Sequence, residues 1–122
     1  MEKQRIGELG EKLAADFLEK RGYRILARNF KILPFGELDI IARAPEGVLV
    51  FVEVKTLIAT GGGLIPEDNL TAAKLQKLKK ASEITLLRKP GLLTNVGWQI
   101  DLVAVSFDGE DKPQIRHYQK IN

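Results

Sequence analysis

Ionisable side chains interrupt two neighbouring apolar runs whose residue types are typical of buried strands. Asp39 lies in the first run, and Glu53 and Lys55 lie in the second. Side chains two residues apart on a strand share a face, so Glu53 and Lys55 point the same way, opposite the valines at positions 48, 50, 52 and 54. Because unpaired charges on a half-buried face are costly, we expect these carboxylates to pair with cations or to bind a metal ion.

The connection between the two runs sets which residues face each other. It contains Ala44-Pro45-Glu46-Gly47, a composition typical of a hairpin turn. Directly opposed residues share a face, so Asp39 joins Glu53 only if paired residue numbers add to an even total. A total of 92 sets Asp39 against Glu53 and Glu37 against Lys55, with about 5 Å between Cβ atoms. We therefore predict this register, with an odd-length connection or a bulge at the turn.

Two carboxylates at this spacing suit one kind of chemistry. With the backbone carbonyl of Val54, Asp39 and Glu53 offer the hard oxygen ligands that Mg²⁺ prefers, and Mn²⁺ is an alternative ion. A bound cation lowers the pKa of a water molecule and neutralises charge on a phosphate, while Lys55 orients that water or stabilises the transition state. The pattern predicts phosphodiester hydrolysis.

The elements that position these residues follow from hydrophobic periodicity. Apolar residues three and four positions apart over 6–18 predict an amphipathic helix ending at Gly22, and a second helix is expected from Thr71 to just before Pro90. Strands are expected at 23–30, 35–43, 48–57 and 98–105, with a short fifth strand at 114–118. The order α-β-β-β-α-β(-β) predicts an α/β domain with a mixed four- to five-stranded sheet flanked by helices.

Composition limits the classes of protein that this chain can represent. Its 122 residues, 44% of them apolar, fit a single domain spanning 1–122. The absence of cysteine excludes disulfides and thiolate metal sites, and His117, the one histidine, leaves little material for a histidine-based zinc site. The polar N-terminal sequence and the lack of a long apolar run predict a cytoplasmic protein with no membrane role. A net charge of +3 is compatible with a nucleic-acid partner without establishing one.

Asp39 followed by Glu53-Val54-Lys55 resembles the D…(D/E)-x-K signature of the PD-(D/E)XK nuclease superfamily. The flanking motifs extend the likeness: Gly10-Glu11, Arg28-Asn29-Phe30, Gly36-Glu37-Leu38-Asp39, Phe51-Val52-Glu53-Val54-Lys55-Thr56 and Thr71-x-x-Lys74. Over residues 5–105 the chain is similar to the YraN family of predicted endonucleases, relatives of archaeal Holliday-junction resolvases. The resemblance implies a restriction-endonuclease-like fold and magnesium held by Asp39 and Glu53, with Glu11 as an added ligand. It also implies DNA, including branched DNA, as the substrate.

Some residues depart from the superfamily pattern or stand outside it. Leu38 replaces the proline that often precedes the aspartate, and Leu57 stands where an arginine often follows the motif lysine. The apolar residues after the motif, Leu57, Ile58, Ala59, Leu64 and Ile65, predict a subunit contact like that of the dimeric resolvases, hence a homodimer. Lys74 and Lys77 are candidate phosphate contacts on the second helix, although lysine-rich helix faces commonly only solvate the helix.

Three functions are compatible with this pattern. The first is a magnesium-dependent endonuclease acting on DNA. The second is a non-catalytic nucleic-acid-binding module on the same fold, and the third is a protein-interaction domain in which Asp39, Glu53 and Lys55 form a structural ion-pair cluster. By the same logic, Glu11 is either a metal ligand or an ordinary helix carboxylate, and Glu37 is expected to pair with Lys55 or another cation rather than to bind a metal ion.

Overall fold

The computed structural model describes residues 3–58, 70–107 and 112–122. The elements are α1 (Lys3–Lys20), β1 (Arg24–Ile32), β2 (Gly36–Arg43), β3 (Leu49–Ile58), α2 (Ala72–Arg88), the short 3₁₀ helix η2 (Pro90–Leu92), β4 (Trp98–Phe107) and β5 (Gln114–Tyr118). The order α-β-β-β-α-β-β confirms the predicted mixed sheet with flanking helices, including the fifth strand. Within the described ranges, neither helix has the length and apolar character needed to cross a bilayer.

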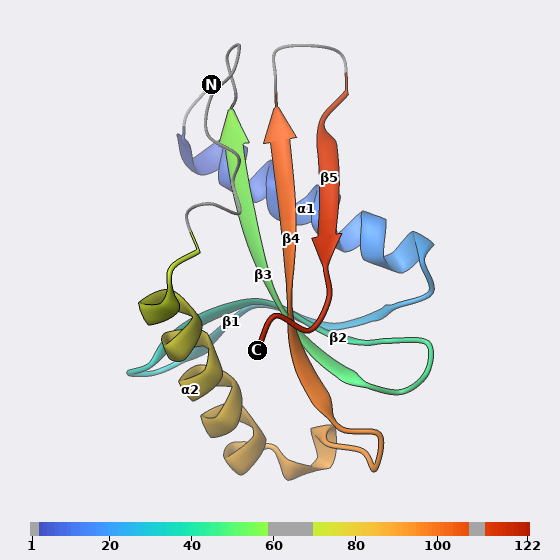
Figure 1. Cartoon of the computed structure of the whole chain (residues 1–122), viewed down its shortest axis with the longest axis vertical. Coiled ribbons are helices and arrows are strands. Elements are labelled where there is room, and N and C mark those ends of the chain that lie inside the picture. Colours follow the sequence, from blue (N-terminus) through green and yellow to red (C-terminus); the bar gives the residue numbers. More distant parts are fainter. Residues whose placement is uncertain (1–2, 59–69, 108–111) are drawn as a thin grey trace.

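One sheet joins all the strands in the order β1-β2-β3-β4-β5 (Figure 1). The pairs β1–β2, β2–β3 and β4–β5 are antiparallel, and β3–β4 is parallel. A parallel pair needs a long crossover, and α2 lies within that connection. The sheet therefore combines two hairpin-type connections at its start with one helical crossover.

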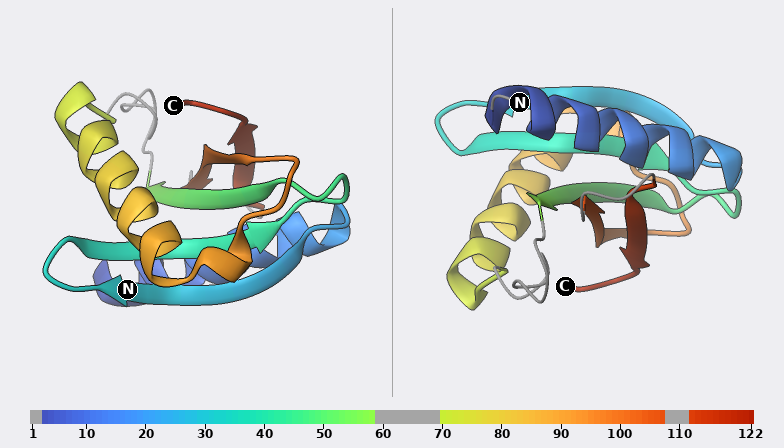
Figure 2. Two further views of the ribbon diagram at one scale, coloured as in Figure 1. Left: turned by 90° about the horizontal axis from the view of Figure 1, so that it is seen from below. Right: turned by 90° about the horizontal axis from the view of Figure 1, so that it is seen from above.

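The two helices cover opposite faces of the sheet (Figure 2). Val50 and Val52 of β3 are buried in the core that contains Leu18 of α1. Phe51, between them, is buried in the second core with Ala81 of α2. This alternation is the period-2 pattern expected of a strand covered on both faces. The odd-numbered face of β3, which carries Glu53 and Lys55 farther along, is thus the side of α2.

The predicted register between β2 and β3 is confirmed. Paired residues run from Arg43–Leu49 to Ile40–Val52, and each pair of numbers adds to the expected total of 92. The connection is the odd-length loop 45–47, which is closed by a hydrogen bond from the Ala44 N–H to the Val48 carbonyl at 2.9 Å. Parity at the turn therefore fixes which side chains of the two strands share a face.

The β2–β3 ladder ends at Ile40–Val52, before the strands themselves end. Beyond this point β2 stays paired with β1 as far as Gly36–Ile32, and β3 stays paired with β4 as far as Ile58–Phe107. The sheet thus opens into two arms, which run in different directions in Figure 1. We call this opening the fork. The ladder stops one pair short of the predicted Asp39–Glu53 position, so the predicted ladder pairing of Glu37 with Lys55 is not formed.

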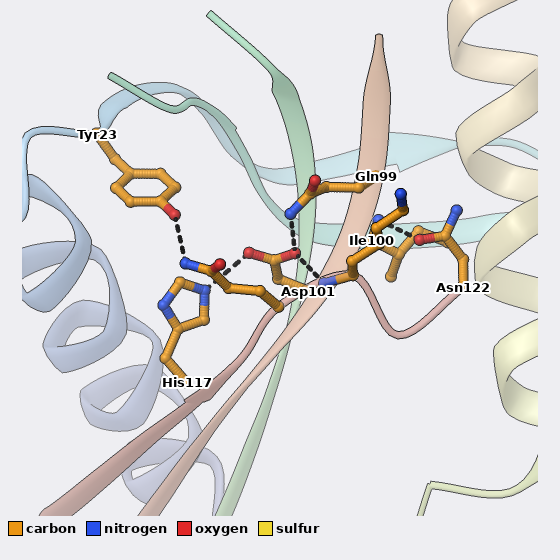
Figure 3. A network of polar contacts seen from close by, with 8 residues as sticks. Tyr23, Gln99, Ile100, Asp101, His117 and Asn122 are labelled. Atoms are coloured by element: carbon orange, nitrogen blue, oxygen red, sulfur yellow. Dashed lines mark hydrogen bonds and ion pairs between the residues drawn. The ribbon is translucent and has the colours of Figure 1, made fainter. Parts of the chain in front are cut away.

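A buried polar network fastens the C-terminal residues to β4 (Figure 3). Asp101 is fully buried; it accepts hydrogen bonds from Gln99 Nε2 and the Lys120 N–H, each at 2.9 Å, and its Oδ2 lies 2.8 Å from His117 Nε2. The Ile100 N–H donates to Asn122 Oδ1 at 2.9 Å. These hydrogen bonds hold the residues after β5 against the first half of β4. The carboxylate of Asp101, which accepts two of them, is buried.

Asp101→Asn is expected to lower the free energy of unfolding by about 2–4 kcal/mol. The new amide nitrogen would face donors, and buried partners would lose their acceptor. Urea unfolding measures this cost. Asp16→Asn is the matched control, because Asp16 is an exposed partner of Lys12 and its change should cost less than about 1 kcal/mol. Equal costs for the two substitutions would contradict a structural role for the Asp101 network.

Candidate active site

The centre of the candidate site is a backbone group that the fork leaves without a ladder partner. The Val54 N–H, just past the last β2–β3 pair, donates instead to the Asp39 carboxylate at 2.8 Å. In a strand the N–H and C=O of one residue face the same neighbour, so the Val54 carbonyl faces this gap as well. A side chain thus takes the place of the missing strand partner, and Asp39 is fixed in the opening of the fork.

Asp39 and Glu53 form a close carboxyl pair. Burial, the charge of Glu53 and a hydrogen bond with the Glu53 side chain raise the pKa of Asp39 to about 8, and the Val54 N–H only partly opposes this rise. Two carboxylates that share a small site cannot both ionise cheaply. In the absence of a cation, the Asp39–Glu53 pair therefore holds a proton at neutral pH.

Lys55 extends the site along β3 on the face that the sequence predicts. Its Nζ lies 3.2 Å from Glu53 Oε2, with the two side chains 24% and 16% exposed. The contact confirms that Glu53 and Lys55 point the same way. The ammonium group of Lys55 thus brings a positive charge next to the carboxyl pair.

A groove of about 290 Å³ runs from this point toward α2. Its charged walls are formed by Glu37, Glu53, Lys55, Lys74 and Lys77. The two lysines named as candidate phosphate contacts thus line the same groove as Lys55. The groove thus brings lysines from β3 and α2 together with carboxylates from β2 and β3.

Glu11 reaches the fork from α1, on the opposite side of the sheet. Its approach depends on Gly10, because a Cβ at that position would overlap the Thr56 side chain of β3. Burial and the charge of Glu37 raise the pKa of Glu11, whereas Arg28 and Asn29 lower it and Glu53 adds to the rise. Gly10 therefore lets the helix sit close enough to β3 for Glu11 to join the electrostatics of the site.

Asn29 belongs to the site although its residue type and spacing predicted no role for it. It lies in β1 between the paired residues Arg28 and Phe30, in a left-handed conformation with φ of 52° that asparagine tolerates better than most residues. With its amide nitrogen turned toward the carboxylates, Asn29 donates to Glu11 Oε1 at 2.6 Å and to Glu37 Oε1 at 3.0 Å. The asparagine of the Arg-Asn-Phe motif thus links two carboxylates from different elements.

The structure brings Asp39, Glu53 and Lys55 together at the fork, with Glu11 nearby. In the described part of the chain, no three histidine, aspartate or glutamate side chains converge closely enough to enclose a metal ion by themselves. Glu11 as an added ligand therefore stays a prediction. Of the predicted subunit contact, Leu57 is partly buried and Ile58 is 50% exposed, while Ala59, Leu64 and Ile65 lie outside the described residues.

Gly10→Ala is expected to lower the free energy of unfolding by about 1–3 kcal/mol, because the added methyl group must displace Thr56 or the helix. Gly7→Ala is the matched control in the same helix. Among the described residues, no atom outside the backbone of the helix itself lies within 4 Å of a Cβ there, so alanine should be neutral or stabilising. Thermal unfolding of the two variants checks the contrast, and the added change Thr56→Ala should recover part of the loss. A loss at Gly7 as large as that at Gly10 would contradict the close approach.

Two of the solved structures that this chain resembles are distant likenesses. One is an EndoMS–dsDNA2 complex, with 21% identity and a TM-score of 0.46 over 78% of this chain and 35% of that one. The other is Pyrococcus furiosus SfsA in complex with Ca²⁺, with 16% identity and a TM-score of 0.41 over 97% of this chain and 64% of that one. This chain thus spans about a third of the EndoMS chain and under two thirds of SfsA. Neither structure is similar enough to show what this chain does.

Sequence relatives are much closer. A UPF0102 protein of Trichlorobacter lovleyi is 38% identical over 93% of this chain and 87% of its own length. A UPF0102 protein of Geobacter sulfurreducens is 42% identical over 92% of this chain and 84% of its own length. The model of uncharacterised protein family UPF0102 matches residues 10–105, a span that includes Gly10, the fork and the second helix. The chain therefore belongs to family UPF0102, the YraN family that its motifs resemble.

Proposed function

We propose that this protein is a Mg²⁺-dependent endonuclease that hydrolyses phosphodiester bonds of DNA. The observation that carries the proposal is the convergence of Asp39 and Glu53 at the fork, with Lys55 beside them. The same residues form the D…E-x-K motif that resembles the PD-(D/E)XK nucleases. Strand geometry and motif thus support the same three residues independently.

The donor set at the fork fits a magnesium ion. Asp39, Glu53 and the Val54 carbonyl would hold it, with Glu11 as an added ligand directly or through water. Mg²⁺ is usually held by one or two carboxylates while keeping several waters, so the absence of three converging side chains among the described residues is no obstacle. Burial and the neighbouring Glu53 carboxyl raise the pKa of Asp39, and a divalent cation would favour its ionised form against both. When bound, the cation supplies Lewis acidity toward a phosphate oxygen and lowers the pKa of a water molecule.

The protein groups have separate tasks in the proposed hydrolysis. Lys55, held by Glu53 at 3.2 Å, orients the attacking water and stabilises charge on the phosphoryl oxygens. The water oxygen bonds to phosphorus as the bond to the leaving ester oxygen breaks, and that oxygen takes up a proton. Asn29 keeps Glu11 and Glu37 in place around this centre. These side chains therefore position the reacting groups and compensate negative charge, which are the main requirements of phosphoryl transfer.

The groove supports a nucleic-acid substrate. Lys74 and Lys77 line it together with Lys55, so a strand with its scissile phosphate at the fork would carry its neighbouring phosphates past the start of α2. Phosphate contacts of this kind give affinity and orientation. The likeness to resolvases favours branched DNA. It also favours a homodimer, for which the exposed Ile58 at the end of β3 is a candidate contact.

Cleavage of end-labelled DNA tests this function. Wild type should cut one or more of a four-way junction, a flap, a single strand and a duplex in Mg²⁺ and none of them in a chelator. Asp39→Asn and Lys55→Ala should each slow cleavage by at least about 100-fold. The first weakens the hold on the cation that would compensate charge in the transition state, and the second removes the ammonium group that does so.

Asp16→Asn and Lys12→Ala are the matched controls, since they change the same residue types in an exposed pair of α1. Both should leave cleavage within about twofold of wild type, as expected for a solvent-exposed pair. Salt-dependent DNA binding without cleavage by wild type would favour the non-catalytic module. Cleavage unaffected by both site substitutions would contradict the assignment of Asp39 and Lys55.

A further inference from the structure

The tip of the β1–β2 hairpin carries two exposed apolar side chains. Leu33 is 69% exposed and Phe35 is 38% exposed, in the turn between Ile32 and Gly36. Hairpin turns commonly carry polar residues and glycine, as does the loop 45–47 between β2 and β3. Leaving large apolar groups in water at a turn forgoes the stabilisation that burial gives. This tip is therefore suited to a contact with something outside the chain.

The tip is held in place by contacts on both of its sides. The Phe35 N–H donates to the Ile32 carbonyl at 2.7 Å across the turn. Arg88, at the end of α2, donates through Nη1 to the Leu33 carbonyl at 3.2 Å. Ile32 and Leu38, which flank the turn, are buried in the core on the α2 side. The hairpin thus presents Leu33 and Phe35 from an anchored turn.

Phe35 is also part of the candidate site. It lines the same groove as Glu53, Lys55, Lys74 and Lys77. An apolar small molecule does not suit a groove with this many charges. An aromatic ring set among lysines is instead the combination with which proteins hold an unpaired nucleotide: the cations contact phosphates and the ring stacks on a base.

We propose that Phe35 receives an unstacked base next to the phosphate bound at the fork. The proposal rests on the proposed nuclease function and specifies its substrate class: DNA with an unpaired base at that position, as at a gap, a bulge or a branch point. In a continuous duplex that base is already stacked and paired, and extracting it costs free energy. Phe35 is therefore a specificity-determining residue, while the fork carries the chemistry.

The test compares a continuous duplex with the same duplex carrying a single-nucleotide gap opposite a 2-aminopurine base. Binding is measured in an Asp39→Asn background, which prevents cleavage. The gapped DNA should bind more tightly than the duplex. The 2-aminopurine fluorescence should be quenched on binding, as expected when the base stacks on an aromatic ring.

Phe35→Ala should weaken binding of the gapped DNA by about 5- to 100-fold, the range for losing one base–aromatic stack, and should change duplex binding little. Phe35→Tyr should retain the preference and the quenching, which separates stacking from a folding defect. Leu87→Ala is the control for an exposed apolar residue away from this groove, since Leu87 is 76% exposed on α2. Its preference for gapped DNA should be unchanged.

Equal binding of the two DNAs, or a preference that survives Phe35→Ala, would overturn the inference. These results separate it from the proposed function. Wild-type cleavage with no preference for unpaired bases would leave the nuclease standing and remove the role of Phe35. A Phe35-dependent preference in a protein that cleaves nothing would support the base contact and contradict the nuclease.

Discussion

The structure of the site depends on one hydrogen bond, from the Val54 N–H to the Asp39 carboxylate. β2 and β3 must separate for a side chain to enter between them, and separation leaves a backbone donor without its ladder partner. Asp39 satisfies that donor and is thereby fixed beside Glu53. The contact stabilises the ionised form of Asp39, but burial and the neighbouring carboxyl group outweigh it and raise the pKa to about 8. Two ionised carboxylates at the fork would repel each other, a repulsion that we call the charge conflict. Either a proton or a cation removes it.

The surrounding elements keep this arrangement in place. β3 remains paired with β4 beyond the fork, which keeps Glu53 and Lys55 on an extended strand while β2 turns away with β1. On the other face, Gly10 lets α1 approach β3, and Asn29 ties Glu11 to Glu37. The same face carries the Asp101 network, which anchors the C-terminal residues to β4. Paired strands and a packed helix therefore surround the fork, and sites built on such elements are positioned more precisely than sites on loops.

Much of this could be predicted from residue types and spacing. The period-2 pattern of β3 and the parity of the hairpin fixed the faces of Glu53 and Lys55, and the register of β2 and β3 followed. Parity cannot tell where a ladder ends, so the fork was not foreseen. The role of Asn29 could not be predicted, because its contacts join three elements and its left-handed backbone depends on the tertiary structure. Asp101 did carry a signal, since it too is a charged residue inside an apolar strand.

The most direct test of the charge conflict at the fork is the number of protons released when Mg²⁺ binds. Calorimetric titrations at pH 7 in buffers of different ionisation enthalpy give this number. A carboxyl group with a pKa of about 8 is mostly protonated at pH 7, so binding should release about one proton per ion and fewer as the pH rises well above 8. Asp39→Asn should release none. Magnesium binding to wild type without proton release at pH 7, or with a release that persists in Asp39→Asn, would contradict the account.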